Sequence, residues 1–306
     1  MRRITLFVLT NLLIIAVVSV SFSVIGSFLS ARGVDISLYQ QAGINYTGLL
    51  IFCTIFGIGG AMISLLLSKT IAKSSMRVKL IDPIRASSGE KDLINMVAEL
   101  AKAADIAMPE VGIFPSAQAN AFATGWNKNK ALVAVSAGML RDFDKREVRA
   151  VMAHEVGHIA NGDMVTLALI QGVINVFVLF AARVVAFFVD KFVLRREGGG
   201  IGMGYFITVL AFDMIFGILA STVVCAFSRW REYRADSFAA VATSPADMIA
   251  ALRRLQSAYD QPSEITDSLV AFGIKGKKNK FLSLLATHPP LEKRIAALEK
   301  AAPFIS

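Results

Sequence analysis

HEVGHIANGDMVTLALIQGVINVFVLFAARVVAFFV, residues 154–189, joins a stretch with two histidines directly to a long apolar run. His154 and His158 are four residues apart, so on a helix both imidazoles lie on one face, about one turn apart. The apolar run, residues 164–189, contains Arg183 as its one charged residue and exceeds the ~20 residues that a helix needs to cross a hydrocarbon core. The stretch therefore predicts a polar helix that leads into a membrane segment.

The composition of the whole chain also indicates a membrane protein. Of the 306 residues, 55% are hydrophobic and only 18% are charged, and the mean hydropathy is +0.59; an ordinary soluble domain is less apolar. The ample apolar content, with only 8 prolines and 2 cysteines, excludes a disordered chain, a collagen-like repeat and a disulfide-stapled secreted module. Cys53 and Cys225 lie within apolar runs and are predicted to be buried packing residues.

Four stretches are long and apolar enough to cross a membrane. They are residues 4–29, 44–67, 164–189 and 201–227. The first is predicted to be an uncleaved anchor, because its apolar run is longer than that of a signal peptide and no A-x-A cleavage site follows.

The basic residues near these segments predict the orientation. Arg2 and Arg3 precede the first segment and Lys69 and Lys73 follow the second, which places the N-terminus and the region after Lys69 in the cytoplasm. The net charge of +9 is then explained by the membrane topology rather than by nucleic-acid binding.

The hairpin formed by the third and fourth segments is less regular. Arg183 and Asp213 lie within its apolar runs, where lone charges are costly. The connection between the two segments carries both basic and acidic residues, namely Lys191, Arg195, Arg196, Asp190 and Glu197. Two interpretations stay open: a contact between Arg183 and Asp213 on neighbouring helices, or a hairpin that is only partly embedded.

The polar residues form two pieces that are expected on one face of the membrane. In the first piece Ser87 and Glu90 predict a capping box that opens an amphipathic helix, and a second helix is expected from Asp144. Short apolar runs at residues 111–114, 121–124 and 131–136 predict a small sheet. In the second piece, helices are expected to begin near Pro245 and Pro290.

His154 and His158 belong to an H-E-x-x-H motif, and the chain has only three histidines in all. On a helix each imidazole can give a nitrogen to the same zinc ion, at about 2.0–2.1 Å. Glu155 then projects beside the metal, where its carboxylate can take a proton from water. Since so short a motif also occurs by chance, the alternative is an amphipathic helix with two incidental histidines on its rim.

A catalytic zinc site needs a third protein ligand. A metzincin is excluded, because the positions where that class requires Gly and His hold Asn161 and Met164. Glu232 and Asp236, one turn apart just after the fourth apolar segment, resemble the third-ligand helix of gluzincins, in which the Glu binds the metal and the Asp fixes the tautomer of a ligand histidine. The alternative makes both residues ordinary juxtamembrane charges that balance Arg229, Arg231 and Arg234.

Three features together resemble one family of membrane peptidases. They are HEVGHIANGD at residues 154–163, SRWREYRAD at residues 228–236, and the four hydrophobic segments in this order. The whole chain is similar to the HtpX-type heat-shock metalloproteases of bacterial inner membranes, in the group that also includes the CAAX-prenyl-protein endopeptidases. The resemblance implies a zinc endopeptidase with one zinc ion per chain, held by His154, His158 and Glu232, with Glu155 as the base.

The expected fold is a membrane α-helical protein with four hydrophobic segments plus an α+β zincin-like catalytic domain of mainly helices and a small sheet. Its parts are two transmembrane helices in residues 1–67, two pieces of the catalytic domain in residues 68–163 and 228–306, and the hydrophobic hairpin in residues 164–227. The resemblance implies a multi-pass protein of the bacterial inner membrane with the catalytic domain and both termini in the cytoplasm. Its expected partners are the lipid bilayer and, as substrates in stress-related quality control, unfolded or misassembled membrane proteins.

Three further motifs fit this interpretation but leave alternatives. Asn120, Ala121 and Phe122 resemble the edge strand along which gluzincins align substrate, or form an ordinary edge strand. His288 is a candidate for stabilising the oxyanion, unless Thr287 simply caps the final helix. The basic loop with Lys275, Lys277, Lys278 and Lys280 is predicted to be solvated, with contact to anionic lipid as a second possibility.

Two other functions compete with a general endopeptidase. One is a narrow-specificity processing peptidase of the membrane. The other is a non-enzymatic membrane scaffold in which zinc only joins the two polar pieces. Glu155 argues against the scaffold, because a structural zinc site needs no base and usually closes with four protein ligands.

Overall fold

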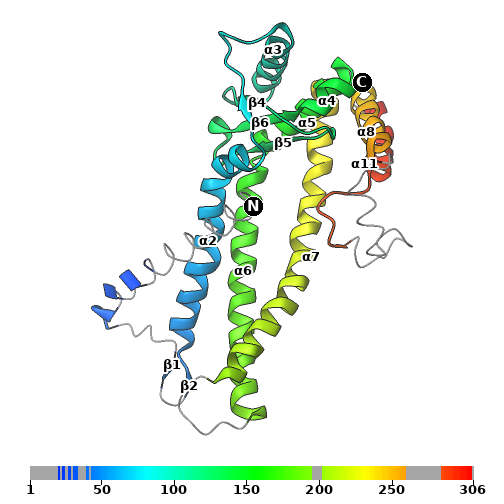
Figure 1. Cartoon of the computed structure of the whole chain (residues 1–306). Helices are drawn as coiled ribbons and strands as arrows, with labels where there is room; N and C mark the ends of the chain where they lie inside the picture. Colours follow the sequence, from blue (N-terminus) through cyan, green and yellow to red (C-terminus); the bar gives the residue numbers. More distant parts are fainter. Residues whose placement is uncertain are drawn as a thin grey trace. The chain divides into compact units, whose positions relative to one another are not determined.

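The computed structural model describes residues 20, 23–24, 27–28, 30–33, 39–40, 43–194, 202–259 and 284–304 (Figure 1). These residues pack as two compact units. One, called the membrane unit here, comprises the described residues of Met1–Leu65 and Thr166–Val224. The other, called the polar unit, comprises those of Leu66–Val165 and Cys225–Ser306.

Three long apolar helices are candidate membrane spans. They are α2 (Tyr46–Ser75), α6 (Asp163–Phe188), which a π-helical turn η2 (Val189–Val193) extends, and α7 (Met203–Ala242). A two-stranded hairpin of β1 (Tyr39–Gln40) and β2 (Gly43–Ile44) precedes α2. The three helices confirm three of the predicted apolar segments, while the predicted segment at residues 4–29 lies almost wholly outside the described residues.

Small residues allow α2 and α6 to approach closely within the membrane unit. A Cβ atom on Gly57 of α2 would lie 2.7 Å from the main-chain nitrogen of Val176 on α6, so no larger side chain fits without a shift. Nearby, Cys53 is fully buried against α6, and both Cys53 and Cys225 are free thiols. The prediction that both cysteines are buried packing residues is confirmed.

The two charges in the hairpin lie close together. Arg183 Nη1 is 3.8 Å from Asp213 Oδ1 and donates a hydrogen bond to the Leu179 carbonyl at 2.9 Å. The Arg183 guanidinium also lies over the ring of Phe52, 5.4 Å from its centroid. Of the two interpretations drawn from the sequence, the structure shows the contact between α6 and α7.

The polar unit contains a mixed four-stranded sheet with the order β3-β4-β6-β5. Its strands are β3 (Lys79–Leu80), β4 (Glu110–Phe114), β6 (Leu132–Ser136) and β5 (Ala121–Thr124). β4 and β6 are parallel, whereas β3–β4 and β6–β5 are antiparallel. The predicted small sheet is present, and β5 forms one of its edges.

In the described part of the polar unit, five helices and the end of α7 surround this sheet. They are α3 (Ser88–Ala103), α4 (Ala137–Asp142), α5 (Lys145–Ala160), α8 (Pro245–Tyr259) and α11 (Leu291–Ala301), with short 3₁₀ turns η1 (Lys128–Lys130) and η3 (Ala302–Phe304). α5 packs against α3, α8 and β5, and α8 packs against α11, which lies beside it in Figure 1. The histidine-bearing helix is therefore enclosed by the core.

The helix starts follow the predicted caps. Ser87 with Glu90, and Asp144 with Glu147, form capping boxes in which side chain and main chain bond reciprocally. α11 differs, because Pro290 is its N-cap and makes no side-chain capping bond. The alternative role of Thr287 as the cap of the final helix was thus wrong, since Pro290 sets the turn by its fixed φ.

Gly138 predicts a measurable effect on the stability of the polar unit. A Cβ atom there would lie 2.1 Å from the carbonyl oxygen of Ala117, which is main chain and cannot rotate away. We expect Gly138→Ala to destabilise the protein by about 1–3 kcal/mol, as overpacking does, and to lower the unfolding temperature in detergent. Gly89→Ala, which meets nothing within 4 Å, is the control; equal unfolding temperatures for the two variants would contradict this account.

Candidate metal centre

Two buried histidines on α5 point at one position. His154 and His158 are 6% and 8% exposed, and their Nε2 atoms are 3.1 Å apart. The rings meet edge to face with centroids 4.6 Å apart. The four-residue spacing on a helix produces this arrangement, as the motif predicted.

Glu232 of α7 faces the same position. Its Oε1 lies 3.3 Å from His158 Nε2 and its Oε2 lies 3.5 Å from His154 Nε2. The side chain is fully buried, yet neither oxygen makes a hydrogen bond of good geometry. The three residues offer ligand atoms that all lie within 4.8 Å of one another. Two imidazole nitrogens and a buried carboxylate whose oxygens make no hydrogen bond of good geometry fit a divalent cation such as zinc.

A carboxylate lies behind each histidine. His154 Nδ1 is 2.9 Å from Asp236 Oδ1, and His158 Nδ1 is 2.6 Å from Asp163 Oδ2. A carboxylate at Nδ1 favours the tautomer with the proton on Nδ1 and leaves Nε2 free as a ligand. Asp236 lies where the sequence predicted it. Asp163 had no predicted role, although an acid five residues after His158 and directly before an apolar run is a usable signal.

Arg294 of α11 is a second residue that the sequence did not single out. It is 6% exposed and forms a two-pronged ion pair with Asp236, with Nε 2.7 Å from Oδ2. Its Nη1 lies 3.2 Å from Glu232 Oε2. The available signal was a single Arg on the face of the final helix that carries Ile295 and Leu298, both of which are buried.

The buried charges shift the pKa values of the histidines. Burial lowers the pKa of His158, but the adjacent carboxylates of Asp163 and Glu232 outweigh burial and raise it to about 9. Burial also lowers the pKa of His154, and the adjacent carboxylates of Asp236 and Glu232 raise it above the ordinary value in the same way. Without a metal, His158 therefore holds a proton at neutral pH that a metal must displace.

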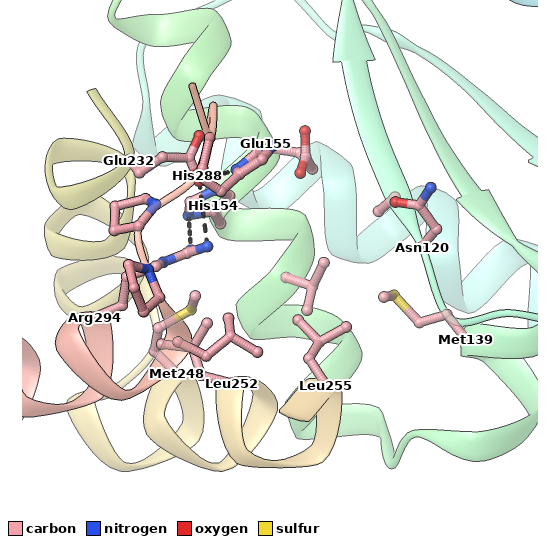
Figure 2. A pocket seen from close by; sticks show the side chains of 16 residues that line it. Asn120, Met139, His154, Glu155, Glu232, Met248, Leu252, Leu255, His288 and Arg294 are labelled. Atoms are coloured by element: carbon pink, nitrogen blue, oxygen red, sulfur yellow. Dashed lines mark hydrogen bonds and ion pairs between the residues drawn. The ribbon is translucent and has the colours of Figure 1, made fainter. Parts of the chain in front are cut away.

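The cluster lies at one end of a cavity of about 560 Å³ (Figure 2). Glu155 lines this cavity beside His154, and Asn120 and Ala121 line it at the edge strand. In Figure 2 the Glu155 carboxylate lies on the side of His154 that faces Asn120. The remaining floor is apolar and is formed by Met139, Val151, Met248, Leu252 and Leu255. A chain lying along β5 would thus pass between Glu155 and the sheet edge.

His288 and Asn120 occupy different parts of this cavity. His288 Nδ1 is 2.9 Å from Glu232 Oε2, while its side chain is 63% exposed. Asn120 precedes β5, where its main-chain nitrogen donates to Ser136 Oγ at 2.9 Å. The predicted basic loop with Lys275, Lys277, Lys278 and Lys280 lies outside the described residues.

Comparisons with known proteins agree with the motifs. The family described as Peptidase family M48 matches residues 87–302. Proteins named Protease HtpX are similar over nearly their full length: 53% identity in Alcanivorax borkumensis, covering 98% of this chain and 99% of the relative, and 53% in Hahella chejuensis, covering 97% and 99%. Among solved structures, that titled "Crystal Structure of S. mikatae Ste24p" has a TM-score of 0.63 at 14% identity and covers 97% of this chain and 67% of that one. This last likeness concerns the fold alone.

The raised pKa values predict that zinc binding releases protons. At pH 7.5, below the pKa of about 9 of His158, the metal-free site is protonated and must lose protons when it binds a metal. We expect calorimetric titration with zinc to give heats that vary with the ionisation enthalpy of the buffer, and an apparent affinity that rises with pH up to about 9. Heats that are the same in all buffers would contradict the predicted protonation.

The contact between Asp163 and His158 predicts that removing the charge of Asp163 weakens zinc binding. Asp163→Asn keeps the shape of the side chain but removes the charge that orients His158, so we expect zinc to bind about 10–100-fold more weakly. Competition with a chromogenic chelator measures the change. Asp92→Asn, at an exposed acid that pairs with Lys145, is the control. Unchanged affinity in Asp163→Asn would show that His158 is held without this carboxylate.

Proposed function

Because this chain belongs to peptidase family M48 and is a membrane metalloendopeptidase, we propose that His154, His158 and Glu232 hold a catalytic zinc ion and that Glu155 is the general base. The observation that carries the proposal is the convergence, at one end of a cavity, of two Nε2 atoms and a buried carboxylate that makes no hydrogen bond of good geometry. Glu155 lines the cavity beside them and belongs to no ligand set. One zinc ion per chain is proposed.

The proposed reaction is the hydrolysis of a peptide bond. A zinc ion held by His154, His158 and Glu232 would supply a Lewis acid for the scissile carbonyl and would lower the pKa of water at the site toward about 7. Glu155 accepts a proton from the attacking water while the water oxygen bonds to the carbonyl carbon. Glu155 then returns that proton to the leaving amine as the C–N bond breaks. Asp163 and Asp236 keep the two histidines in the orientation that the ligand set needs.

His288 is proposed to stabilise the negative charge that develops on the carbonyl oxygen. Its Nδ1 faces Glu232, which turns the other ring nitrogen away from that carboxylate. The ring is largely exposed at the cavity, so a substrate can reach it. Hydrogen-bond donors aimed at a developing oxyanion are typically a large part of catalysis.

Asn120, Ala121 and Phe122 are proposed to bind the substrate main chain. Ala121 and Phe122 begin β5, the edge strand, and Asn120 and Ala121 line the cavity. An extended peptide can pair with such an edge through main-chain hydrogen bonds, which accept many sequences. This supports an endopeptidase that acts on unstructured chain.

The proposed cellular role follows from the sequence. The basic residues Arg2, Arg3, Lys69 and Lys73 favour a cytoplasmic N-terminus and a cytoplasmic region after Lys69. The resemblance to the HtpX-type proteases supports a multi-pass protein of the bacterial inner membrane with both termini and the catalytic domain in the cytoplasm. We divide the chain into two transmembrane helices (residues 1–67), a hydrophobic hairpin (164–227) and two pieces of the catalytic domain (68–163 and 228–306). The proposed substrates are unfolded or misassembled membrane proteins, in quality control under stress.

Two alternatives to a general endopeptidase predict different experimental results. A structural zinc scaffold would close the metal with four protein ligands, whereas the cluster found among the described residues has three. A narrow processing peptidase would leave unrelated unfolded proteins such as casein uncut.

Glu155→Gln and Glu232→Gln separate the two proposed roles. We expect Glu155→Gln to keep its zinc and lower kcat by about 10²–10⁴-fold, because the base is lost and the ligands remain. Glu232→Gln is expected to lose zinc as well. Purified full-length protein in detergent is stripped with a chelator and reloaded, zinc is counted by atomic absorption, and casein cleavage is followed by gel.

The control for both variants is Glu99→Gln, at an exposed acid of α3 that pairs with Arg149. It should match the wild type in zinc content and turnover. Wild-type turnover by Glu155→Gln would refute the role of Glu155. Full zinc content in Glu232→Gln would refute the ligand role of Glu232.

A further inference from the structure

One face of helix α7 holds the segment that carries His288. Cys225, Arg229, Glu232 and Asp236 are spaced by four, three and four residues, which places them on the same side of the helix. All four contact residues 284–294, which we call the strap. The partners on the strap are the Leu285 carbonyl for Cys225, the carbonyls of Leu284 and Ala286 for Arg229, His288 for Glu232 and Arg294 for Asp236.

Arg229 makes the firmest polar contact on the N-terminal side of His288. Its Nη1 donates to the Leu284 carbonyl at 2.9 Å and to the Ala286 carbonyl at 2.8 Å. Hydrogen bonds from a charged donor are roughly twice as strong as neutral ones. The planar guanidinium fixes the direction of both bonds, whereas the Cys225 thiol is a weak donor. Arg229 therefore fixes the main chain two residues before His288.

His288 itself is held loosely. Its side chain is 63% exposed and contacts Glu232 at a single nitrogen. Thr287 before it is exposed, and Pro289 after it is buried. The position of the imidazole thus depends on the main chain on either side: Arg229 fixes one side, and Pro289 with the start of α11 fixes the other. In Figure 2 the imidazole lies beside Glu232 and His154.

We propose that Arg229 is a positioning residue, which clamps the Leu284 and Ala286 carbonyls and thereby sets His288 at the rim of the metal site. Arg229 is not among the residues that line the described cavity, so it acts through His288 rather than on substrate. The proposal rests on the proposed function, which gives His288 its catalytic role. It replaces the interpretation of Arg229 as a charge that merely balances its acidic neighbours.

A double-mutant cycle tests the proposal kinetically. Zinc-loaded wild type, Arg229→Ala, His288→Ala and the double variant are compared in detergent with a fluorogenic peptide substrate. We expect Arg229→Ala to lower kcat about tenfold, as small displacements of a catalytic group do, with KM and zinc content unchanged. In the His288→Ala background the same change is expected to lower kcat less than about twofold, because coupled residues are not additive.

Two further variants define the chemistry of the clamp. Arg229→Lys keeps the charge but loses the planar pair of donors, so its kcat is expected between those of wild type and Arg229→Ala. Arg231→Ala removes a neighbouring positive charge of α7 whose partner is Ser228. It is the matched control and should equal the wild type.

NMR signals of the histidines test the position of His288 without measuring catalytic turnover. The chain has three, so protein labelled with ¹³C at histidine Cε1 and purified without a histidine tag gives three signals. The signal that disappears in His288→Ala identifies His288. In zinc-loaded Arg229→Ala we expect this signal to move to the position of free histidine, while those of His154 and His158 stay in place. Arg231→Ala is expected to move none of the three.

Together, the kinetic cycle and the histidine NMR measurement distinguish failure of this proposal from failure of the proposed function. An unmoved His288 signal in Arg229→Ala, or equal kcat losses in both backgrounds, would overturn the role of Arg229 even if wild type cleaves the peptide. Loss of zinc in Arg229→Ala would also overturn it, because the residue would then act on the metal site as a whole. If wild type fails to cleave at all, the proposed function fails, and the His288 signal still decides whether Arg229 positions that ring.

Discussion

The buried carboxylate of Glu232 is the constraint around which the site is built. It lies between two imidazoles on one side and the Arg294 guanidinium on the other, and it makes no hydrogen bond of good geometry. Asp163 and Asp236 add further buried negative charge, which Arg294 offsets only in part. With neutral histidines the cluster therefore carries an excess of negative charge that a divalent cation would balance. The same excess of negative charge explains why the pKa values of both histidines are raised.

Close packing of α5 against α7 brings the three proposed ligands together. Gly157, between the two histidines, faces Phe238 of α7, and a Cβ atom there would lie 3.0 Å from the Phe238 ring. With a larger residue the Phe238 side chain would have to shift by a few tenths of an ångström. This contact lies where α5 supplies two proposed ligands and α7 supplies Glu232. The glycine of the motif thus has a packing role of its own, beside the chemistry of its neighbours.

The sequence predicted those parts of the site that local spacing determines. His154, Glu155 and His158 follow from helical periodicity, and the capping box at Ser87 and the helix start at Asp144 follow from the residues that form them. Glu232 and Asp236 needed a family resemblance, because no local rule joins residues so far apart in the chain. Arg294 and Arg229 were missed because their contacts depend on tertiary packing, which places the strap along α7. The two-residue strand β3 was missed for the same reason. Among the described residues its regular structure comes from pairing with β4, which is distant in the sequence.

Under the proposed function, the edge strand β5 determines which proteins the enzyme accepts as substrates. Main-chain hydrogen bonds depend little on side-chain identity. An edge strand therefore binds a stretch of polypeptide because its main chain is unpaired, whichever residues it contains. A stably folded protein must first open, at a cost of about 5–15 kcal/mol for a whole domain, and is protected in proportion to that cost. The discrimination between intact and damaged proteins would then come from the folding free energy of the client, with no dedicated recognition surface needed on the protease.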